Sequence, residues 1–278
     1  MMFHYFSEYI YNWINRQNHV KEESLTDWLL YEISQQCDFI YYQAFSRHEE
    51  AQNGSDWEWW ILTTDENERH KFNAYRFMVQ AKKLFPNGKD NYSLISYGNK
   101  YGTQVDLLLD SASVRNALPI YFFYSIGKSD VLEQIKNVQY INSRTHMWCE
   151  NCINGCYISL AKVVYDILYK YPKMKVLDSQ LLNNSFKLSI LDLVFKKNHK
   201  EIDYIMNLFN SRLLIDNVVS GRKYNNLDVN GIQHNEKSIP QYLKVFIQSK
   251  NENLNWIQSE MRIDDISGLG VIDLRHNE

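Results

Sequence analysis

The chain of 278 residues has little proline, glycine or cysteine, with four, ten and four of them. So few prolines and glycines leave little material for flexible linkers, and we find no repeat or low-complexity segment. The cysteines suit no disulfide framework, because Cys37 stands alone and the other three fall between 149 and 156. No apolar run approaches the roughly 20 residues of a membrane span, and the N-terminus lacks the basic start and cleavage site of a signal peptide. We expect a cytoplasmic protein without membrane association.

An excess of basic residues is also missing. Thirty Lys and Arg residues stand against 33 Asp and Glu residues, which gives a formal charge of -3. This excludes a broadly basic surface that coats nucleic acid, so DNA binding would need a local patch or the charge of a bound metal. Hydrophobic residues make up 45% of the chain and aromatic residues 14%, which is ample for a packed core.

The clearest pattern lies between residues 49 and 84, where two apolar segments predict neighbouring strands. Residues 54–62 combine a Gly-x-Asp turn with a run of Trp, Ile and Leu, and residues 73–84 form the second segment. The polar residues 63–71 between them indicate a hairpin loop, so the strands should be antiparallel. Gln80 and Lys82 are two apart and point to the same face. We therefore expect Asp56 to meet Gln80 and Lys82.

These three side chains suit the hydrolysis of a phosphodiester. That reaction uses a carboxylate to hold a divalent metal, a second oxygen ligand, and a cation that steadies the attacking water or the charge on phosphate. Asp56, Gln80 and Lys82 supply one of each. The pattern resembles the PD-(D/E)XK nuclease superfamily, and within it the Mrr-like enzymes that have Gln-x-Lys. It is also similar to an uncharacterised bacterial family with Gly-x-Asp-Trp-x-Trp followed by Gln-Ala-Lys.

The resemblance implies an α/β fold with a restriction endonuclease-like core, a mixed sheet flanked by helices in the order α-β-β-β-α-β. It covers residues 20–126, with a helical extension at 1–19 and a mainly helical elaboration at 127–278 that packs on the core. In the core we expect a helix from Glu22 to about Gln36, with a Ser24/Asp27 pair like a capping box at its start. A strand should follow at 37–45, and after the two strands above we expect a helix at 103–115 and a strand at 118–125. In the elaboration, Cys156 should open a helix at 157–171, followed by a helix at 238–247 and a last strand at 268–274 near the sheet edge.

Further ligands are suggested around Asp56. Glu50 fits the Glu-x-x-x-Gly-x-Asp arrangement of the similar family and would add a second carboxylate for Mg²⁺ or Mn²⁺; otherwise it is a solvated loop residue. The resemblance also implies a metal-facing acid on the preceding helix, matched by Glu23, which could instead only favour the helix N-terminus. Gln104, near a helix start, either faces the phosphate or caps the helix.

Other residues have two interpretations each. Glu58 either lines the cleft or pairs across the strands with Arg76 or Lys71, and tryptophans 57, 59 and 60 favour the core over base stacking. A zinc site could use the soft ligands of one short stretch, although Cys156 also suits a packed core. Its ligands would be His146, Cys149, Cys152 and Cys156. The basic cluster 196–200 could touch DNA or form a charged helix end.

The functional expectation is a Mg²⁺- or Mn²⁺-dependent endonuclease that acts on DNA. Asp56, Glu50 and Gln80 would bind the metal, and Lys82 would orient the water. The resemblance implies bacterial defence against foreign DNA, with a homodimer or companion defence subunits. The alternative is a catalytically inactive nuclease-fold protein that binds nucleic acid or a protein partner, which the acidic balance and the Gln in place of an acid favour.

Overall fold

A computed structural model describes most of the chain. The described residues are 2–45, 53–64, 71–85, 87–92, 95, 98–127, 153–170, 176–193, 202–203, 205–209, 233–249, 256 and 267–275. None of the helices in these ranges is both long and apolar enough to cross a membrane.

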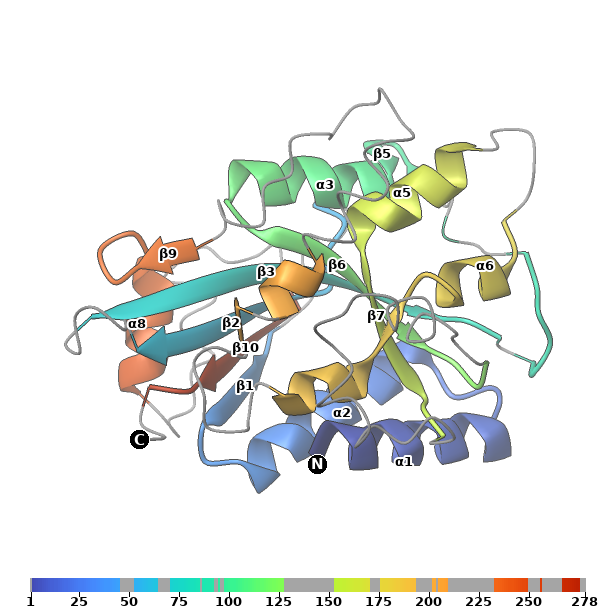
Figure 1. The fold of residues 1–278 in the computed structure, drawn as a ribbon, viewed down its shortest axis with the longest axis horizontal. Coiled ribbons are helices and arrows are strands. Elements are labelled where there is room, and N and C mark those ends of the chain that lie inside the picture. Colours follow the sequence, from blue (N-terminus) through green and yellow to red (C-terminus); the bar gives the residue numbers. More distant parts are fainter. Residues whose placement is uncertain are drawn as a thin grey trace.

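The described residues form a mixed sheet with helices on both faces (Figure 1). Its strands lie in the order β1-β10-β2-β3-β6-β7-β8, and β9 pairs with the first residues of β3. The β10–β2 and β3–β6 pairs are parallel, and the other pairs are antiparallel. The sheet strands are β1 (Ile40–Ala44), β2 (Trp57–Thr64), β3 (Phe72–Lys83), β6 (Leu118–Tyr124), β7 (Cys156–Leu160), β8 (Phe186–Lys187), β9 (Gln233–Asn235) and β10 (Gly268–Asp273).

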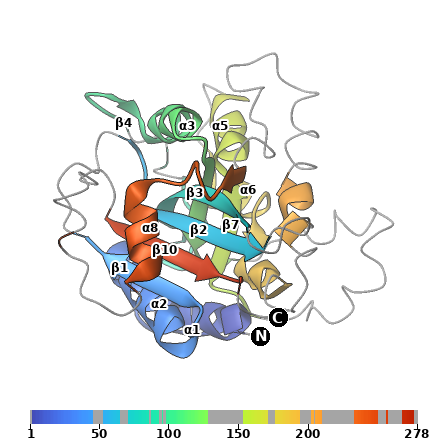
Figure 2. The same ribbon diagram turned by 90° about the vertical axis from the view of Figure 1, so that its left-hand side faces the viewer.

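The helices form two layers (Figures 1 and 2). One face of the sheet packs against α1 (Met2–Arg16) and α2 (Glu22–Gln36). The other face is covered by α3 (Gln104–Val114), α5 (Ala161–Lys170) and α6 (Asp178–Leu182), with α8 (Gln241–Gln248) over the β2 and β10 end. A small hairpin of β4 (Gly98–Asn99) and β5 (Gly102–Thr103) leads into α3, and a short 3-10 helix, η2 (Leu188–Leu193), contacts α1.

Alternation along β2 and β3 divides the core between these layers. Trp57, Trp59 and Ile61 belong to the cluster under α1 and α2, whereas Trp60 and Leu62 pack against α8. All three tryptophans of β2 are at most 4% exposed, as the sequence predicted for core residues.

The predicted α-β-β-β-α-β order appears along the chain as α2, β1, β2, β3, α3 and β6, with the short β4–β5 hairpin inserted before α3. The hairpin prediction is also confirmed, since β2 and β3 pair antiparallel from Trp57 opposite Val79 to Thr64 opposite Phe72. The predicted helix is confirmed, since α2 spans Glu22–Gln36, but its predicted cap is wrong: the N-cap is Lys21, which makes no side-chain hydrogen bond. Ser24 and Asp27 lie inside the helix and form no capping box at its start.

Two predictions for the C-terminal half are also wrong. Cys156 opens strand β7, and the helix begins only at Ala161. The sequence did not reveal this change from strand to helix, because no Gly or Pro marks it within one apolar run. Strand β10 lies between β1 and β2 and not at the sheet edge. Residues 127–278 thus contribute β7, β8, β9 and β10 to the same sheet as the expected core.

Glycine explains the central position of β10. Gly270 stands opposite Trp59, and a Cβ atom there would lie 2.2 Å from Cδ1 of the indole. The glycine therefore leaves the space that the Trp59 ring fills. The strand was expected near the sheet edge, whereas the missing side chain at Gly270 lets it lie beside Trp59 inside the sheet.

Candidate functional site

Two carboxylates cover the edge of β3 beyond the start of β2. Because β2 begins at Trp57, opposite Val79, the following N–H groups of β3 have no strand partner there. The backbone N–H of Ala81 donates to Asp56 Oδ2, and the N–H of Lys83 donates to Glu22 Oε2, both at 2.6 Å. The end of β3 is therefore fixed by one acid from the turn before β2 and one from the start of α2.

Gln80 connects Asp56 to α3. Its side chain is buried, and its Nε2 donates to Asp56 Oδ2 at 2.6 Å and to the Ala81 carbonyl at 3.0 Å. Its Oε1 accepts from Gln104 Nε2 at 2.7 Å. The structure thus brings together three of the predicted site residues, Asp56, Gln80 and Gln104, in one chain of hydrogen bonds.

Lys82 lies beside this chain and is paired with Glu22. Its Nζ is 3.5 Å from Glu22 Oε1, and both side chains are about one quarter exposed, at 25% and 24%. Burial raises the pKa of Glu22, and the Lys82 ammonium and the Lys83 N–H oppose this rise. Lys83 points elsewhere: its Nζ donates to the carbonyls of Asn18 and Val20 in the α1–α2 loop.

The position of Asp56 depends on a close approach between its turn and α3. Gly54 has φ +75°, and a Cβ atom there would lie 2.5 Å from the Gln104 carbonyl oxygen and 2.7 Å from the Leu108 nitrogen. Asn53 Oδ1 accepts from the N–H and the hydroxyl of Ser55, which closes the turn. Gly54 is therefore what lets the Asp56 turn lie against the helix that carries Gln104.

The first turn of α3 is itself held in place. Thr103 is the N-cap and accepts from the Asp106 N–H at 3.4 Å. The Asp106 carboxylate also accepts hydrogen bonds from the Thr103 hydroxyl and, at 3.0 Å, from the Tyr169 hydroxyl of α5. Gln104 follows this cap directly, so its backbone is fixed on both sides.

Two buried polar atoms near these residues have no hydrogen-bond partner within the described part of the chain. They are Gln104 Oε1 and the hydroxyl of Tyr121, which stands beside Gln80 in the β3–β6 register. Burial, and then the charges of Asp56, Asp106 and Glu22, raise the pKa of Tyr121 well above its ordinary value. A phenol hydroxyl and an amide oxygen on two residues that adjoin Gln80 thus have unused hydrogen-bonding capacity.

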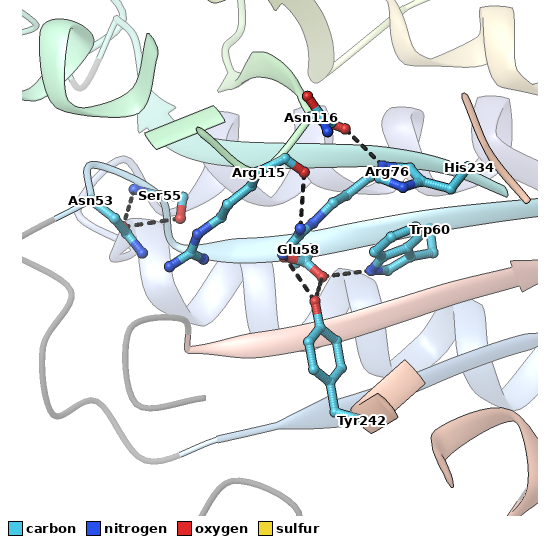
Figure 3. A network of polar contacts seen from close by, with 9 residues as sticks. All are labelled: Asn53, Ser55, Glu58, Trp60, Arg76, Arg115, Asn116, His234 and Tyr242. Atoms are coloured by element: carbon cyan, nitrogen blue, oxygen red, sulfur yellow. Dashed lines mark hydrogen bonds and ion pairs between the residues drawn. The ribbon is translucent and has the colours of Figure 1, made fainter. Parts of the chain in front are cut away.

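A second polar network lies further along the same face of β2 and β3 (Figure 3). The Glu58 carboxylate is fully buried. It accepts hydrogen bonds from Arg76 Nη2 at 2.6 Å, from Trp60 Nε1 at 2.5 Å and from the Tyr242 hydroxyl of α8. Arg76 also donates to the Arg115 carbonyl at the end of α3. Of the two interpretations of Glu58, the structure supports the pair with Arg76, which ties the two strands to α3 and α8.

The oxygen atoms at Asp56 suit a divalent cation. Mg²⁺ and Mn²⁺ prefer carboxylate and carbonyl oxygens, and the Asp56 carboxylate and Ala81 carbonyl are close enough for one Gln80 amide to bond both. The Gln80 carbonyl is a third oxygen of the same kind. The described residues contain no group of three or more His, Cys, Asp or Glu side chains that could hold a metal, so a cation here would depend on these amide and backbone oxygens.

The structure does not describe all of the predicted ligands, and two of the described ones are separate from the Asp56 site. Glu50 is outside the described residues, as are His146, Cys149 and Cys152 of the suggested zinc site and the basic cluster 196–200. Cys156 is described and fully buried in β7, where burial raises the pKa of its thiol. Glu23 is exposed on the first turn of α2, and its neighbour Glu22 is the acid that contacts β3.

Sequence reasoning missed Glu22 and Tyr121. The resemblance was matched to Glu23, although the sequence alone does not show which of two adjacent acids at a helix start turns toward the sheet. Tyr121 gave no signal, because a tyrosine within an aromatic strand predicts only packing.

The fold and these contacts define an α/β protein with a mixed sheet, in which a carboxylate, two amides and a lysine gather where β2 begins. The family of unknown function DUF6615 matches residues 1–267, and the chain belongs to this family. Searches of curated proteins and of solved structures find no match.

Proposed function

We propose that this protein is a metal-dependent nuclease that hydrolyses DNA phosphodiester bonds, in bacterial defence against foreign DNA. The observation that carries the proposal is the contact of Asp56 with Gln80 and the Ala81 backbone, beside Lys82. This arrangement offers oxygen ligands and a cation within one short stretch of β3, as hydrolysis of a phosphodiester requires.

Each residue has a role in the proposed reaction. Asp56, the Ala81 carbonyl and the Gln80 carbonyl would hold Mg²⁺ or Mn²⁺, and the ion would supply a Lewis acid for the phosphate and the attacking water. Lys82 orients that water and stabilises the negative charge that develops on the phosphate oxygens. Glu22 holds both the Lys82 ammonium and the Lys83 backbone, and so fixes where that charge lies. Water adds to phosphorus, the P–O bond to one sugar breaks, and the products are a phosphate monoester and an alcohol.

The second candidate is an inactive relative that binds nucleic acid or a protein partner. It is favoured by the amide at position 80, where Gln80 Nε2 already satisfies Asp56 Oδ2 without a metal. Binding of this kind would need the positive charge of Lys82 but not the carboxylate of Asp56.

Plasmid cleavage separates the two candidates. Wild type, Asp56→Asn and Lys82→Ala are incubated with plasmid DNA and Mg²⁺ or Mn²⁺, with Asp110→Asn on α3 and Lys89→Ala as matched controls of equal charge change. We expect cleavage by wild type and both controls, and a loss of at least roughly 100-fold in the two site variants, the scale of removing one transition-state contact. Cleavage by Asp56→Asn at the wild-type rate would contradict the nuclease proposal.

A further inference from the structure

The two glutamine side chains at the site point the same way. Gln104 Nε2 donates to Gln80 Oε1 at 2.7 Å, and Gln80 Nε2 donates to Asp56 Oδ2 at 2.6 Å. The remaining acceptor of the pair, Gln104 Oε1, is buried and has no partner in the described part of the chain. Both glutamine side chains therefore donate in the same direction, from Gln104 to Gln80 and from Gln80 to Asp56.

This orientation conflicts with holding a cation. Gln80 Nε2 bonds both oxygens, Asp56 Oδ2 and the Ala81 carbonyl, that would be the ligands. An amide nitrogen is a hydrogen-bond donor and offers no lone pair to a hard cation. Gln80 can contribute an oxygen at this position only if its amide group turns over.

A turn of Gln80 alone would create a new conflict. Its NH₂ group would then face the NH₂ group of Gln104, so that two donors would meet in a buried place. If Gln104 turns as well, its Oε1 accepts from Gln80 Nε2, and its NH₂ group moves to the position that Oε1 holds now, so the conflict between two donors is removed. The backbone of Gln104 does not need to move, because Gly54 and the Thr103 cap hold the start of α3.

We propose that Gln104 is a positioning residue and that the Gln80 and Gln104 amides turn over together when a divalent cation binds beside Asp56. Without the cation, Gln80 Nε2 stabilises the Asp56 carboxylate by a hydrogen bond. With the cation, Gln80 Oε1 faces it, and Gln104 Oε1 holds Gln80 in that orientation. The inference rests on the proposed metal site and adds the residue that sets the direction of its Gln ligand.

The test is NMR of the side-chain amides of the full-length chain, labelled with ¹⁵N-glutamine and titrated with Mg²⁺. The signals of Gln80 and Gln104 are assigned by their loss in Gln80→Met and Gln104→Met. Both pairs should shift together on saturation. Gln104→Glu offers only acceptors, so the Gln80 signals of this variant should lie near their Mg²⁺-bound position before any metal is added.

Calorimetry with Mn²⁺ gives a second readout. Gln104→Glu should bind roughly threefold to tenfold more tightly than wild type, the value of about one hydrogen bond. Asp110→Glu keeps the same charge as wild type on the same helix, and Ser111→Glu adds one charge to α3 away from Gln80, so the second variant measures the effect of charge alone.

The outcomes separate the two proposals. Mn²⁺ binding that Asp56→Asn abolishes, with Gln80 signals that do not move, overturns the coupled turn and leaves the metal site intact. Equal tightening by Ser111→Glu and Gln104→Glu, with unchanged Gln80 signals in the latter before metal is added, also overturns it. Absence of Mg²⁺ and Mn²⁺ binding by wild type overturns both proposals.

Discussion

Asp56 and Glu22 accept hydrogen bonds from alternate backbone N–H groups of one strand, at Ala81 and Lys83, each at 2.6 Å. Alternate residues of a strand lie roughly 7 Å apart, which leaves room for Lys82 between the two acids. Asp56 thus accepts a hydrogen bond from the Gln80 amide, while Glu22 forms an ion pair with Lys82. The two acids have different environments, and this difference can be measured.

Glu22 should make stability depend on pH with a defined sign. Burial raises its pKa above the ordinary 4.5, so the folded protein holds this proton more tightly than the unfolded chain does. The stabilisation from that proton is fully present below pH 4.5 and is lost as the pH rises through the folded-state pKa. Glu22→Gln lacks this loss, so its stability relative to wild type should increase between about pH 4 and pH 8.

Urea denaturation at both pH values measures this change. Glu23→Gln is the matched control, since Glu23 is the exposed neighbour on the same helical turn. It removes the same charge from the same turn, so the comparison isolates the effect of the buried position of Glu22. A Glu22→Gln variant that loses stability relative to wild type as the pH rises would contradict the raised pKa.

The buried pair of Glu58 and Arg76 should be costly to break from one side. Glu58 is fully buried, and removing its carboxylate leaves the Arg76 guanidinium without its charged partner in a nearly buried place. We expect Glu58→Ala to lower the free energy of unfolding by about 3–5 kcal/mol. Chemical denaturation measures it, with the exposed Glu8→Ala on α1 as control, expected within about 0.5 kcal/mol of wild type. A loss below about 1 kcal/mol, as for an exposed pair, would show that Arg76 finds another partner.

The sequence was informative where candidate site residues lay in segments with the two-residue alternation of a strand. The Gly-x-Asp turn, the apolar run after it and the Gln-x-Lys spacing predicted the antiparallel pair β2 and β3 and the meeting of Asp56 with Gln80. Period two alone decides which strand residues share a face. Those predictions needed no information from distant parts of the chain.

The sequence was not informative where the answer lay in distant contacts. The central place of β10 depends on the fit of the Trp59 ring against Gly270, which are more than two hundred residues apart. Which of the adjacent acids Glu22 and Glu23 turns toward β3 depends on how α2 packs against the sheet, and the sequence of the helix does not show this. The orphaned hydroxyl of Tyr121 is visible only once every neighbouring side chain has been placed.

Tyr121 and Tyr124 offer a paired test on one strand. The Tyr121 hydroxyl is buried and has no hydrogen-bond partner among the described residues, whereas the Tyr124 hydroxyl donates to Thr26 at 2.8 Å. Removing an unpaired buried hydroxyl should be neutral or stabilising, and removing a paired one should cost about 1 kcal/mol. Thermal melts of Tyr121→Phe and Tyr124→Phe should therefore shift in different directions or by clearly different amounts. If Tyr121→Phe also lowers plasmid cleavage, the hydroxyl acts on the substrate side, while equal destabilisation by both variants would show that Tyr121 has a partner in the folded protein.

Gly54 should be the least replaceable glycine of the site, because two separate costs meet there. Its φ of +75° disfavours any residue with a side chain, and a Cβ atom would also lie 2.5 Å from the backbone of α3. Gly88 is the matched control: its φ is +70°, but the nearest atom to a Cβ there is 3.4 Å away at the end of the Ile126 side chain. Gly88→Ala should cost about 1–2 kcal/mol from backbone conformation alone. Gly54→Ala should cost about 1–3 kcal/mol more, the usual effect of forcing a methyl group into packed structure, and should also weaken Mn²⁺ binding, because the turn that carries Asp56 must move away from Gln104. Equal losses in the two variants by urea denaturation would mean that α3 gives way to the new methyl group, and that the close contact does not fix the site.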